Sequence, residues 1–213
     1  MLRKIFWDDP YLTELDTRIA DVEGDHVTLS ETIFYAFSGG QESDSGRIAG
    51  FPVLNAAIRD DDIVYTLPSD HGLSAGQPIR VEIDWPRRYR LMRLHFAAEI
   101  VLELVCKQFG DIERIGAHIA EEKARIDFAL AESIKPYLDG LSRDANAIIA
   151  ADMAITSAFS DIAAGRRYWK IAGFGEVPCG GTHLKRTGEV GDISLRRKNI
   201  GGGKERVEVF VST

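Results

Sequence analysis

Residues 85–109 read WPRRYRLMRLHFAAEIVLELVCKQF and divide the chain into two parts with different patterns. Apolar residues recur between Leu91 and Val105 at spacings of three and four, which predicts a long helix from about Tyr89 to about Phe109. Gly110 is a natural stop for that helix. Pro86 restricts the backbone of the residue before it, so we place a domain boundary at Trp85.

The part before this helix has the pattern of a β domain. Short apolar runs are separated by Gly, Asp and Pro, and they predict strands at residues 33–35, 51–54, 63–67 and 79–84. Several short strands at such spacing are typical of a small barrel or sandwich. We therefore expect residues 1–85 to form a β-barrel-like domain.

The part after the helix mixes both kinds of element. Alternation predicts a hairpin of residues 115–119 and 124–128, and residues 129–150 have a helical pattern with a break at Pro136 or Gly140. Further strands are expected at residues 153–156, 169–172, 192–196 and 206–211. The fold class is therefore α+β, with residues 86–213 placing helices on an antiparallel sheet.

Composition limits the functional classes. The 213 residues have no apolar run of transmembrane length, and the N-terminus lacks the apolar core of a signal peptide. Two cysteines far apart in the sequence, Cys106 and Cys179, argue against a disulfide framework and favour a reducing compartment. We expect a cytoplasmic protein with no membrane partner.

Charge is unevenly distributed along the chain. Residues 1–84 contain six basic and 16 acidic side chains (net −10), whereas residues 85–213 contain 20 basic and 17 acidic ones (net +3). Basic clusters of the second part can meet a phosphate backbone, although charge alone favours an ordinary solvated surface.

Two spaced pairs of side chains have metal-ligand chemistry. His95 and Glu99 are four apart on the predicted helix, which places them on one face. Cys179 and His183 are four apart in a loop whose two intervening glycines allow a tight fold, and thiolate sulfur and imidazole nitrogen are preferred zinc ligands. The first pair alone is a weak signal, and the second alone is explained equally well by an ordinary turn.

A glycine-rich stretch, Thr32-Ile33-Phe34-Tyr35 with Ser38-Gly39-Gly40-Gln41 and Asp44-Ser45-Gly46, completes the pattern. Together with Arg93-Leu94-His95, Cys179-Gly180-Gly181-Thr182-His183 and Thr187-Gly188-Glu189-Val190-Gly191, it resembles the motifs of the alanyl-tRNA editing proteins (AlaX type, medium-size form). These are free-standing relatives of the editing domain of alanyl-tRNA synthetase. The resemblance covers nearly the whole chain.

The resemblance implies one zinc ion per chain, held by an H-x-x-x-H pair and a C-x-x-x-H pair. His95, Cys179 and His183 match three of these ligands, but Glu99 stands where the family has its second histidine. Glu99 is the fourth ligand, or it is a general base beside a three-ligand metal with an open water position, or it marks a degraded site.

The resemblance also implies a hydrolase of translation fidelity that removes serine or glycine from mischarged tRNA for alanine. Thr32 and Gln41 are the implied contacts to the serine hydroxyl, although each can equally have a structural role. For the acceptor end of the tRNA we propose contacts that flank the metal motifs: Arg87, Arg88, Arg90, Arg93, Lys185 and Arg186. The protein is expected to be a monomer or a homodimer.

Two rival functions remain open at this point. The Glu99 change allows a non-catalytic RNA-binding module with a degraded metal site, and the same chemistry allows a metal-dependent esterase acting on another aminoacyl compound. His26, His71 and His118 have no second ligand at metal spacing, and we expect ordinary roles for them.

Overall fold

A computed structural model describes residues 2–60, 62–110 and 112–212 of the chain. The chain forms two compact units, Met1–Ser38 with Glu42–Tyr89, and Gly39–Gln41 with Arg90–Thr213. The division falls within the long helix α1 (Trp85–Phe109), four residues after the boundary that we placed at Trp85. The short segment Gly39–Gln41 belongs to the second unit although its neighbours on both sides belong to the first.

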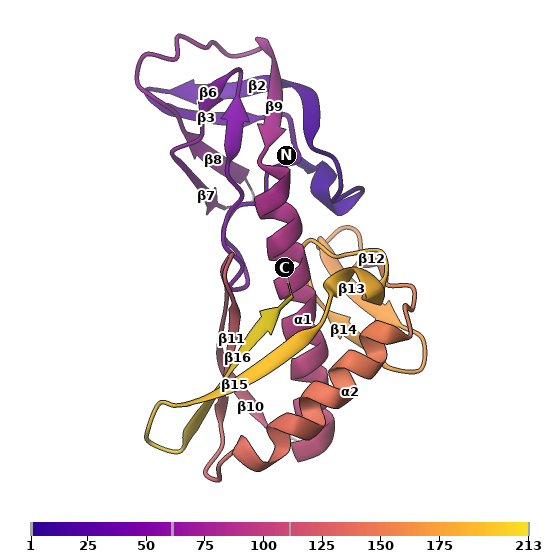
Figure 1. Cartoon of the computed structure of the whole chain (residues 1–213). Helices are drawn as coiled ribbons and strands as arrows, with labels where there is room; N and C mark the ends of the chain where they lie inside the picture. The colour runs from indigo at the N-terminus through magenta and orange to yellow at the C-terminus, as the bar shows by residue number, and fades with distance from the viewer. Residues whose placement is uncertain (1, 61, 111, 213) are drawn as a thin grey trace. The chain divides into compact units, whose positions relative to one another are not determined.

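The first unit is built on a seven-stranded antiparallel sheet in the order β6-β5-β9-β2-β3-β8-β7 (Figure 1). Its strands are β2 (Glu14–Glu23), β3 (His26–Leu29), β5 (Gly46–Ile48), β6 (Phe51–Pro52), β7 (Asn55–Arg59), β8 (Asp62–Thr66) and β9 (Pro78–Ile83). The sheet curls into a half-barrel around a core that includes Ile19, Val27, Tyr65 and Val81. The barrel-like expectation is confirmed.

A shorter pair of parallel strands accompanies this sheet. The pair is β1 (Arg3–Lys4) with β4 (Glu31–Thr32), and the single turn η1 (Ile5–Trp7) follows β1. The strand predicted at residues 33–35 is wrong, because side chains satisfy the backbone there in place of a neighbouring strand. The N–H of Phe34 donates to Thr32 Oγ1, and the N–H of Tyr35 donates to a carboxylate oxygen of Asp44.

The second unit combines most of α1 with a second helix, α2 (Leu138–Ala150), and two antiparallel sheets. One sheet has the order β10-β11-β16-β15, and the other has the order β12-β13-β14. The strands are β10 (Glu113–Ile119), β11 (Ala124–Ala129), β12 (Thr156–Asp161), β13 (Arg166–Ile171), β14 (Gly175–Pro178), β15 (Ile193–Asn199) and β16 (Lys204–Val211). Two short turns, η2 (Lys135–Tyr137) and η3 (Thr187–Val190), complete the unit. The predicted α+β class is therefore confirmed.

Helix α1 begins earlier than its apolar pattern predicts. Asp84 accepts a hydrogen bond from the N–H of Arg87, so it caps the first turn at Trp85. Pro86 is tolerated in that turn because its missing N–H would have had no partner within the helix.

One helix and one strand predicted in the second unit begin later in the sequence than expected. Residues 130–134 are not helical, and the N–H groups of Leu130 and Ile134 donate to the Gly203 carbonyl and to Glu205. The strand expected at residues 153–156 begins only at Thr156. No helix in the described ranges is both long and apolar enough to cross a bilayer.

Candidate metal centre

Three side chains from two distant segments of the second unit converge. His95 lies on α1, and Cys179 and His183 lie in the loop that follows β14. The Cys179 sulfur is 3.3 Å from Nε2 of His95 and 3.3 Å from Nε2 of His183. The three ligand atoms all lie within 4.8 Å of one another, and both histidines are buried. Across the described ranges no other group of three His, Cys, Asp or Glu side chains is placed in this way.

Glycine makes this convergence possible. A Cβ atom at Gly181 would lie 2.6 Å from Cε1 and 2.7 Å from Nε2 of His95, so any larger residue would collide with the imidazole. The N–H of Cys179 donates to the Arg167 carbonyl, which fixes the start of the loop to β13. The spacing of Cys179 and His183 thus brings both to His95 only because position 181 has no side chain.

A hydrogen bond to the other ring nitrogen, Nδ1, fixes the orientation of His183. Its Nδ1 is hydrogen-bonded with Ser157 Oγ at 2.9 Å, which directs Nε2 at the Cys179 sulfur. The ring also packs edge-on against Phe96. Partners of this kind set the ring orientation and tautomer of metal-binding histidines. Ser157 could not be found from the sequence, since nothing local connects it with His183.

Burial shifts the pKa of all three groups. It lowers the pKa of both imidazoles, and at His95 it outweighs the Glu99 carboxylate, which acts in the opposite direction. Both imidazoles are therefore neutral near pH 7. Burial and the Glu99 carboxylate raise the pKa of the Cys179 thiol far above its ordinary value. The nitrogens are thus ready to act as ligands, and a thiolate at Cys179 requires a cation beside it.

Glu99 lies beside this group. Its Oε1 is 3.6 Å from the Cys179 sulfur and 3.8 Å from Nε2 of His95, and its Oε2 accepts a hydrogen bond of 2.9 Å from the Trp169 indole. The side chain is 12% exposed. One carboxylate oxygen is therefore held by the protein and the other is directed at the three-residue group.

The donor set fits a zinc ion. Zinc bonded to sulfur at ~2.3 Å and to nitrogen at ~2.0–2.1 Å in tetrahedral geometry holds those two atoms ~3.5 Å apart. The two sulfur–nitrogen separations here are both 3.3 Å, close to that value.

A small hollow opens next to the group. Its lining residues come from α1, β10, β11 and the Gly39–Gln41 segment, and they are Gly39, His95, Ala98, Glu99, Leu102, Arg114, Ala117, Ile119 and Ile126. Arg114 is exposed and is the only cation in this lining. Arg114 could not be singled out from the sequence, because a lone arginine in a strand belongs to no motif.

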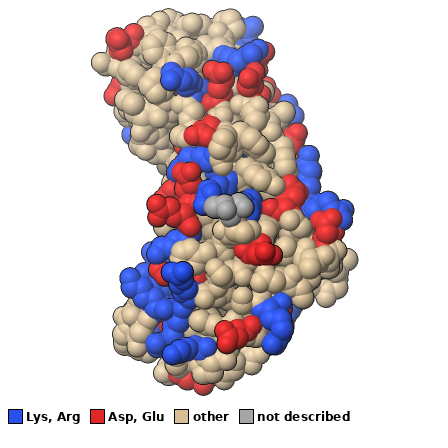
Figure 2. All heavy atoms as spheres, viewed as in Figure 1, with Lys and Arg blue, Asp and Glu red and all other residues tan. Residues whose placement is uncertain are grey.

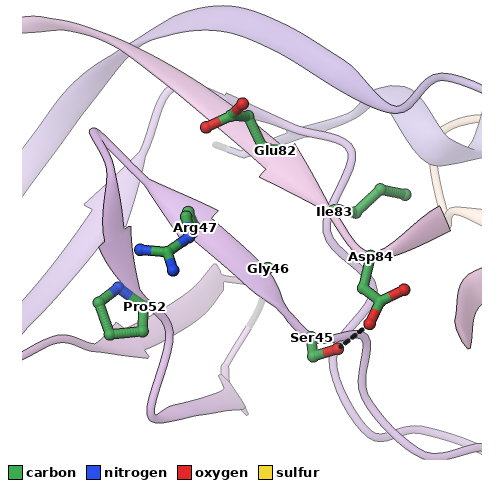
Figure 3. Close-up of a pocket in the computed structure, with 7 residues that line it drawn as sticks. All are labelled: Ser45, Gly46, Arg47, Pro52, Glu82, Ile83 and Asp84. Atoms are coloured by element: carbon green, nitrogen blue, oxygen red, sulfur yellow. Dashed lines mark hydrogen bonds between the residues drawn. The ribbon is translucent and has the colours of Figure 1, made fainter.

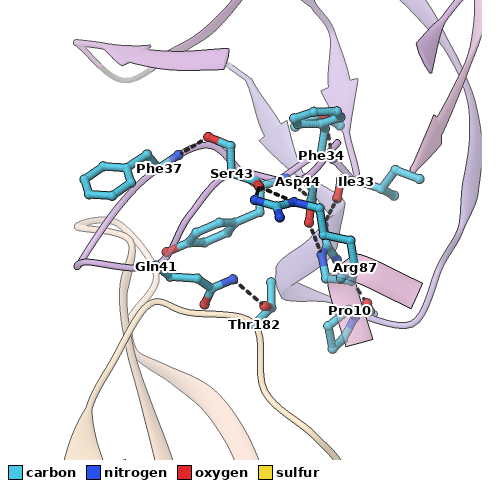
Figure 4. Close-up of polar contacts among 12 residues, drawn as sticks. Pro10, Ile33, Phe34, Phe37, Gln41, Ser43, Asp44, Arg87 and Thr182 are labelled. Carbon is cyan, nitrogen blue, oxygen red and sulfur yellow. Dashed lines mark hydrogen bonds and ion pairs between the residues drawn. The ribbon is translucent and has the colours of Figure 1, made fainter. Parts of the chain in front are cut away.

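Gln41 is placed near the metal motif of the second unit. It is fully buried, and its Nε2 donates to Oγ1 of Thr182 at 3.1 Å (Figure 4). Thr182 lies between the candidate ligands Cys179 and His183, so Gln41 braces the loop that carries them. Gln41 Oε1 has no hydrogen-bond partner in the described part of the chain.

Thr32 belongs to the first unit. It is fully buried, and its hydroxyl pairs with the Tyr65 hydroxyl at 2.7 Å while accepting the N–H of Phe34. These contacts give Thr32 a structural role that the sequence analysis had weighed beside substrate contact.

The arginines that begin α1 are engaged within the first unit. Arg88 is completely buried and donates to Asp44 and to the carbonyls of Pro10 and Ile33. Arg87 donates to Glu42. It also donates to the Ser43 carbonyl (Figure 4). Arg88 therefore has no surface to offer a phosphate, and we remove it from the predicted RNA contacts.

The other predicted RNA contacts lie in the second unit. Arg90 donates to the Glu121 carbonyl, and Arg93 donates to the carbonyls of Val190 and Ser212. Arg186 pairs with Asp152 but keeps 53% of its side chain exposed, and Lys185 is exposed. Lys185 and Arg186 are thus the pair most open to a phosphate.

The first unit has a separate pocket of about 340 Å³ between β5, β6 and β9 (Figure 3). It is lined by Ser45, Gly46, Arg47, Pro52, Glu82, Ile83 and Asp84. Arg47 donates to the Gly50 carbonyl, and Asp84 caps α1. Because it contains neither histidine nor cysteine, this pocket offers no comparable metal chemistry.

Known proteins resemble this chain over nearly its whole length. The domain family described as the threonyl and alanyl tRNA synthetase second additional domain matches residues 170–208. A protein of Pyrococcus horikoshii named alanyl-tRNA editing protein AlaX-M is 31% identical, over 99% of this chain and 98% of its own length. The protein of the same name from Saccharolobus solfataricus is 30% identical, over 97% and 98%. An alanine–tRNA ligase of Ignicoccus hospitalis is 32% identical over 99% of this chain, which spans 26% of that larger protein.

Proposed function

Since the chain belongs to the family of alanyl-tRNA editing proteins, we propose that it hydrolyses the ester bond between a wrongly attached amino acid and tRNA for alanine. The wrongly attached amino acid is serine, glycine or both. The observation that carries the proposal is the group of His95, Cys179 and His183, a donor set suited to zinc within the part of the chain that resembles these relatives. Its proposed place of action is the cytoplasm, where tRNA is aminoacylated.

In this proposal His95, Cys179 and His183 would hold one zinc ion, and Glu99, whose Oε1 lies beside the Cys179 sulfur, would complete the donor set. Bound zinc supplies positive charge that activates a water or holds the aminoacyl group in place. A general-base role for Glu99 is the alternative, and it needs the carboxylate to be free of the metal.

Gln41 and Thr32 differ in their capacity to contact the serine hydroxyl. The unpartnered Oε1 of Gln41 can accept a hydrogen bond from a serine hydroxyl, whereas the Thr32 hydroxyl already has two partners. A site that hydrogen-bonds that hydroxyl rejects alanine by up to about 10⁴–10⁵-fold, because its buried polar group would be left unpaired. We therefore favour Gln41 over Thr32 as the contact that separates Ser-tRNA from Ala-tRNA. It would not separate Gly-tRNA from Ala-tRNA, because neither amino acid has the hydroxyl.

The proposed reaction is tested by deacylation of Ser-tRNA, Gly-tRNA and Ala-tRNA side by side, with and without a chelator. We expect about one zinc per chain after purification without chelator, and loss of activity when zinc is removed. The double variant Cys179→Ala/His183→Ala removes two ligands, so its activity should fall by more than the about 10–100-fold typical of changes around a metal ligand.

Cys106→Ala is the matched control, since this thiol lies on α1 outside the three-residue group and should leave zinc content and turnover intact. Two outcomes would contradict the proposal. Protein that binds tRNA but no zinc is an RNA-binding module with a degraded site. Protein that cleaves Ala-tRNA as fast as Ser-tRNA and Gly-tRNA is an esterase of another kind.

A further inference from the structure

We propose that Trp169 positions Glu99 as a one-oxygen ligand, by holding Oε2 so that only Oε1 faces the metal group. The inference rests on the proposed zinc site and adds a residue that its motifs do not contain. Trp169 lies on β13, 70 residues from Glu99 in the sequence, and its Nε1–H donates to Glu99 Oε2 at 2.9 Å.

The indole is rigidly placed. Trp169 is fully buried, meets Phe96 edge-on with ring centroids 5.3 Å apart, and stacks against Phe174. Phe96 in turn packs against the His183 ring. The tryptophan therefore has little freedom to turn away from Glu99, and its position is tied to that of a ligand.

The hydrogen bond gives the two carboxylate oxygens of Glu99 different roles. Oε2 is engaged by the indole, and Oε1 is left 3.6 Å from the Cys179 sulfur and 3.8 Å from Nε2 of His95. Without the donor, the carboxylate could rotate to offer both oxygens or turn toward solvent. The N–H also withdraws electron density from a ligand that brings one more negative charge than an imidazole would.

A purely structural relation between the two residues predicts something different. A buried indole N–H needs an acceptor, and Glu99 could serve only that need. In that case losing the bond would lower the stability of the fold and leave zinc affinity unchanged. The two relations are therefore separated by measuring metal binding and unfolding on the same variants.

The test is Trp169→Phe, which keeps an aromatic ring and removes the donor. We expect zinc affinity, measured by competition with a chelator, to fall by about 10–100-fold, as for other groups that orient metal ligands. With cobalt(II) in place of zinc, the visible spectrum should also change, because the coordination of Glu99 changes. A tryptophan analogue with sulfur in place of the indole N–H gives the same test without altering the packing.

The decisive measurement repeats Trp169→Phe in a protein that already carries Glu99→Ala. Once the carboxylate is gone, Trp169→Phe should change zinc affinity by less than about twofold. An equal loss in both backgrounds would mean that Trp169 acts through packing and would overturn the proposal. Ile171→Ala is the control, a buried residue on the same strand whose loss should lower stability without altering the cobalt spectrum.

The two levels of inference fail in different ways. Wild-type protein that binds neither zinc nor cobalt would overturn the metal site and this proposal together. Wild-type protein that binds zinc while Trp169→Phe binds it equally well would overturn the role of Trp169 alone.

Discussion

At the scale of single residues, the site depends most sharply on Gly181. A methyl group there would enter the space of the His95 imidazole, with its carbon 2.6 Å from Cε1, and would push the ring away from Cys179. We therefore expect Gly181→Ala to lower zinc affinity at least about tenfold, the low end for displacing a group that supports a metal ligand. Zinc competition and deacylation rates measure this effect.

Gly180 is the matched control for that change. A Cβ at Gly180 would meet nothing within 4 Å, so Gly180→Ala should retain zinc and activity. If both alanine variants bind zinc as wild type does, the close approach of the loop to His95 does not govern the site.

Sequence spacing could single out the candidate metal ligands but not the residues that hold them in place. The separations of His95 from Glu99 and of Cys179 from His183 indicate metal chemistry, because four residues is a local distance in both a helix and a glycine loop. Ser157 and Trp169 touch the same group across 26 and 70 residues of sequence. Their contacts depend on how the β12-β13-β14 sheet meets α1, which no local pattern encodes.

At the scale of elements, the four-stranded sheet contains an ion group with a definite pH dependence. Asp127 on β11 accepts hydrogen bonds from Arg206 on β16, and Arg125 lies within reach on its own strand. Burial alone would raise the Asp127 pKa, but the hydrogen bonds and charges of the two arginines outweigh it and hold the pKa below its ordinary value.

A lowered carboxylate pKa in the folded state fixes the sign of the effect. The stabilisation is present above the unfolded pKa of about 3.9, and it is lost as the pH falls through the lower folded pKa. Asp127→Asn should therefore be less stable than wild type at pH 7, and the difference should shrink below about pH 4. Denaturant unfolding at both pH values measures this, and a difference that does not depend on pH would exclude the ion group as its source.

Element boundaries were predictable only where the local signal was not overridden. The apolar spacing of α1 predicted its end at Phe109 but not its start at Trp85, and alternation predicted the β10–β11 hairpin to within two residues at each strand end. The segment 33–35 has the composition of a strand, yet its backbone bonds to Thr32 and Asp44. The helical pattern of residues 130–134 similarly gives way to bonds with Gly203 and Glu205. The acceptors of these backbone N–H groups are side-chain oxygens or a carbonyl far away in the sequence, so the periodicity of apolar residues could not reveal them.

At the scale of the whole molecule, the net charge of −7 does not reflect the charge of the second unit, where we expect RNA to bind. The acidic excess lies in residues 1–84. Figure 2 shows lysine and arginine side chains gathered where Figure 1 places β15 and β16, and Arg196, Lys198 and Lys204 are exposed on these strands. The second unit thus offers two basic surfaces, this one and the Lys185–Arg186 pair beside the ligand loop.

Salt dependence of tRNA binding distinguishes these surfaces, because each phosphate contact releases counterions. If Lys185 and Arg186 both contact phosphates, Lys185→Ala/Arg186→Ala should flatten the plot of log affinity against log salt by about 1.4–1.8, from 0.7–0.9 per contact. Arg18→Ala/Arg59→Ala removes the same charge from exposed positions of the first unit and should leave the slope unchanged. If Arg196→Ala/Lys198→Ala flattens the slope and the Lys185→Ala/Arg186→Ala variant does not, the phosphate contacts lie on the outer face of the β15–β16 hairpin, and the predicted contacts beside the metal motif are wrong.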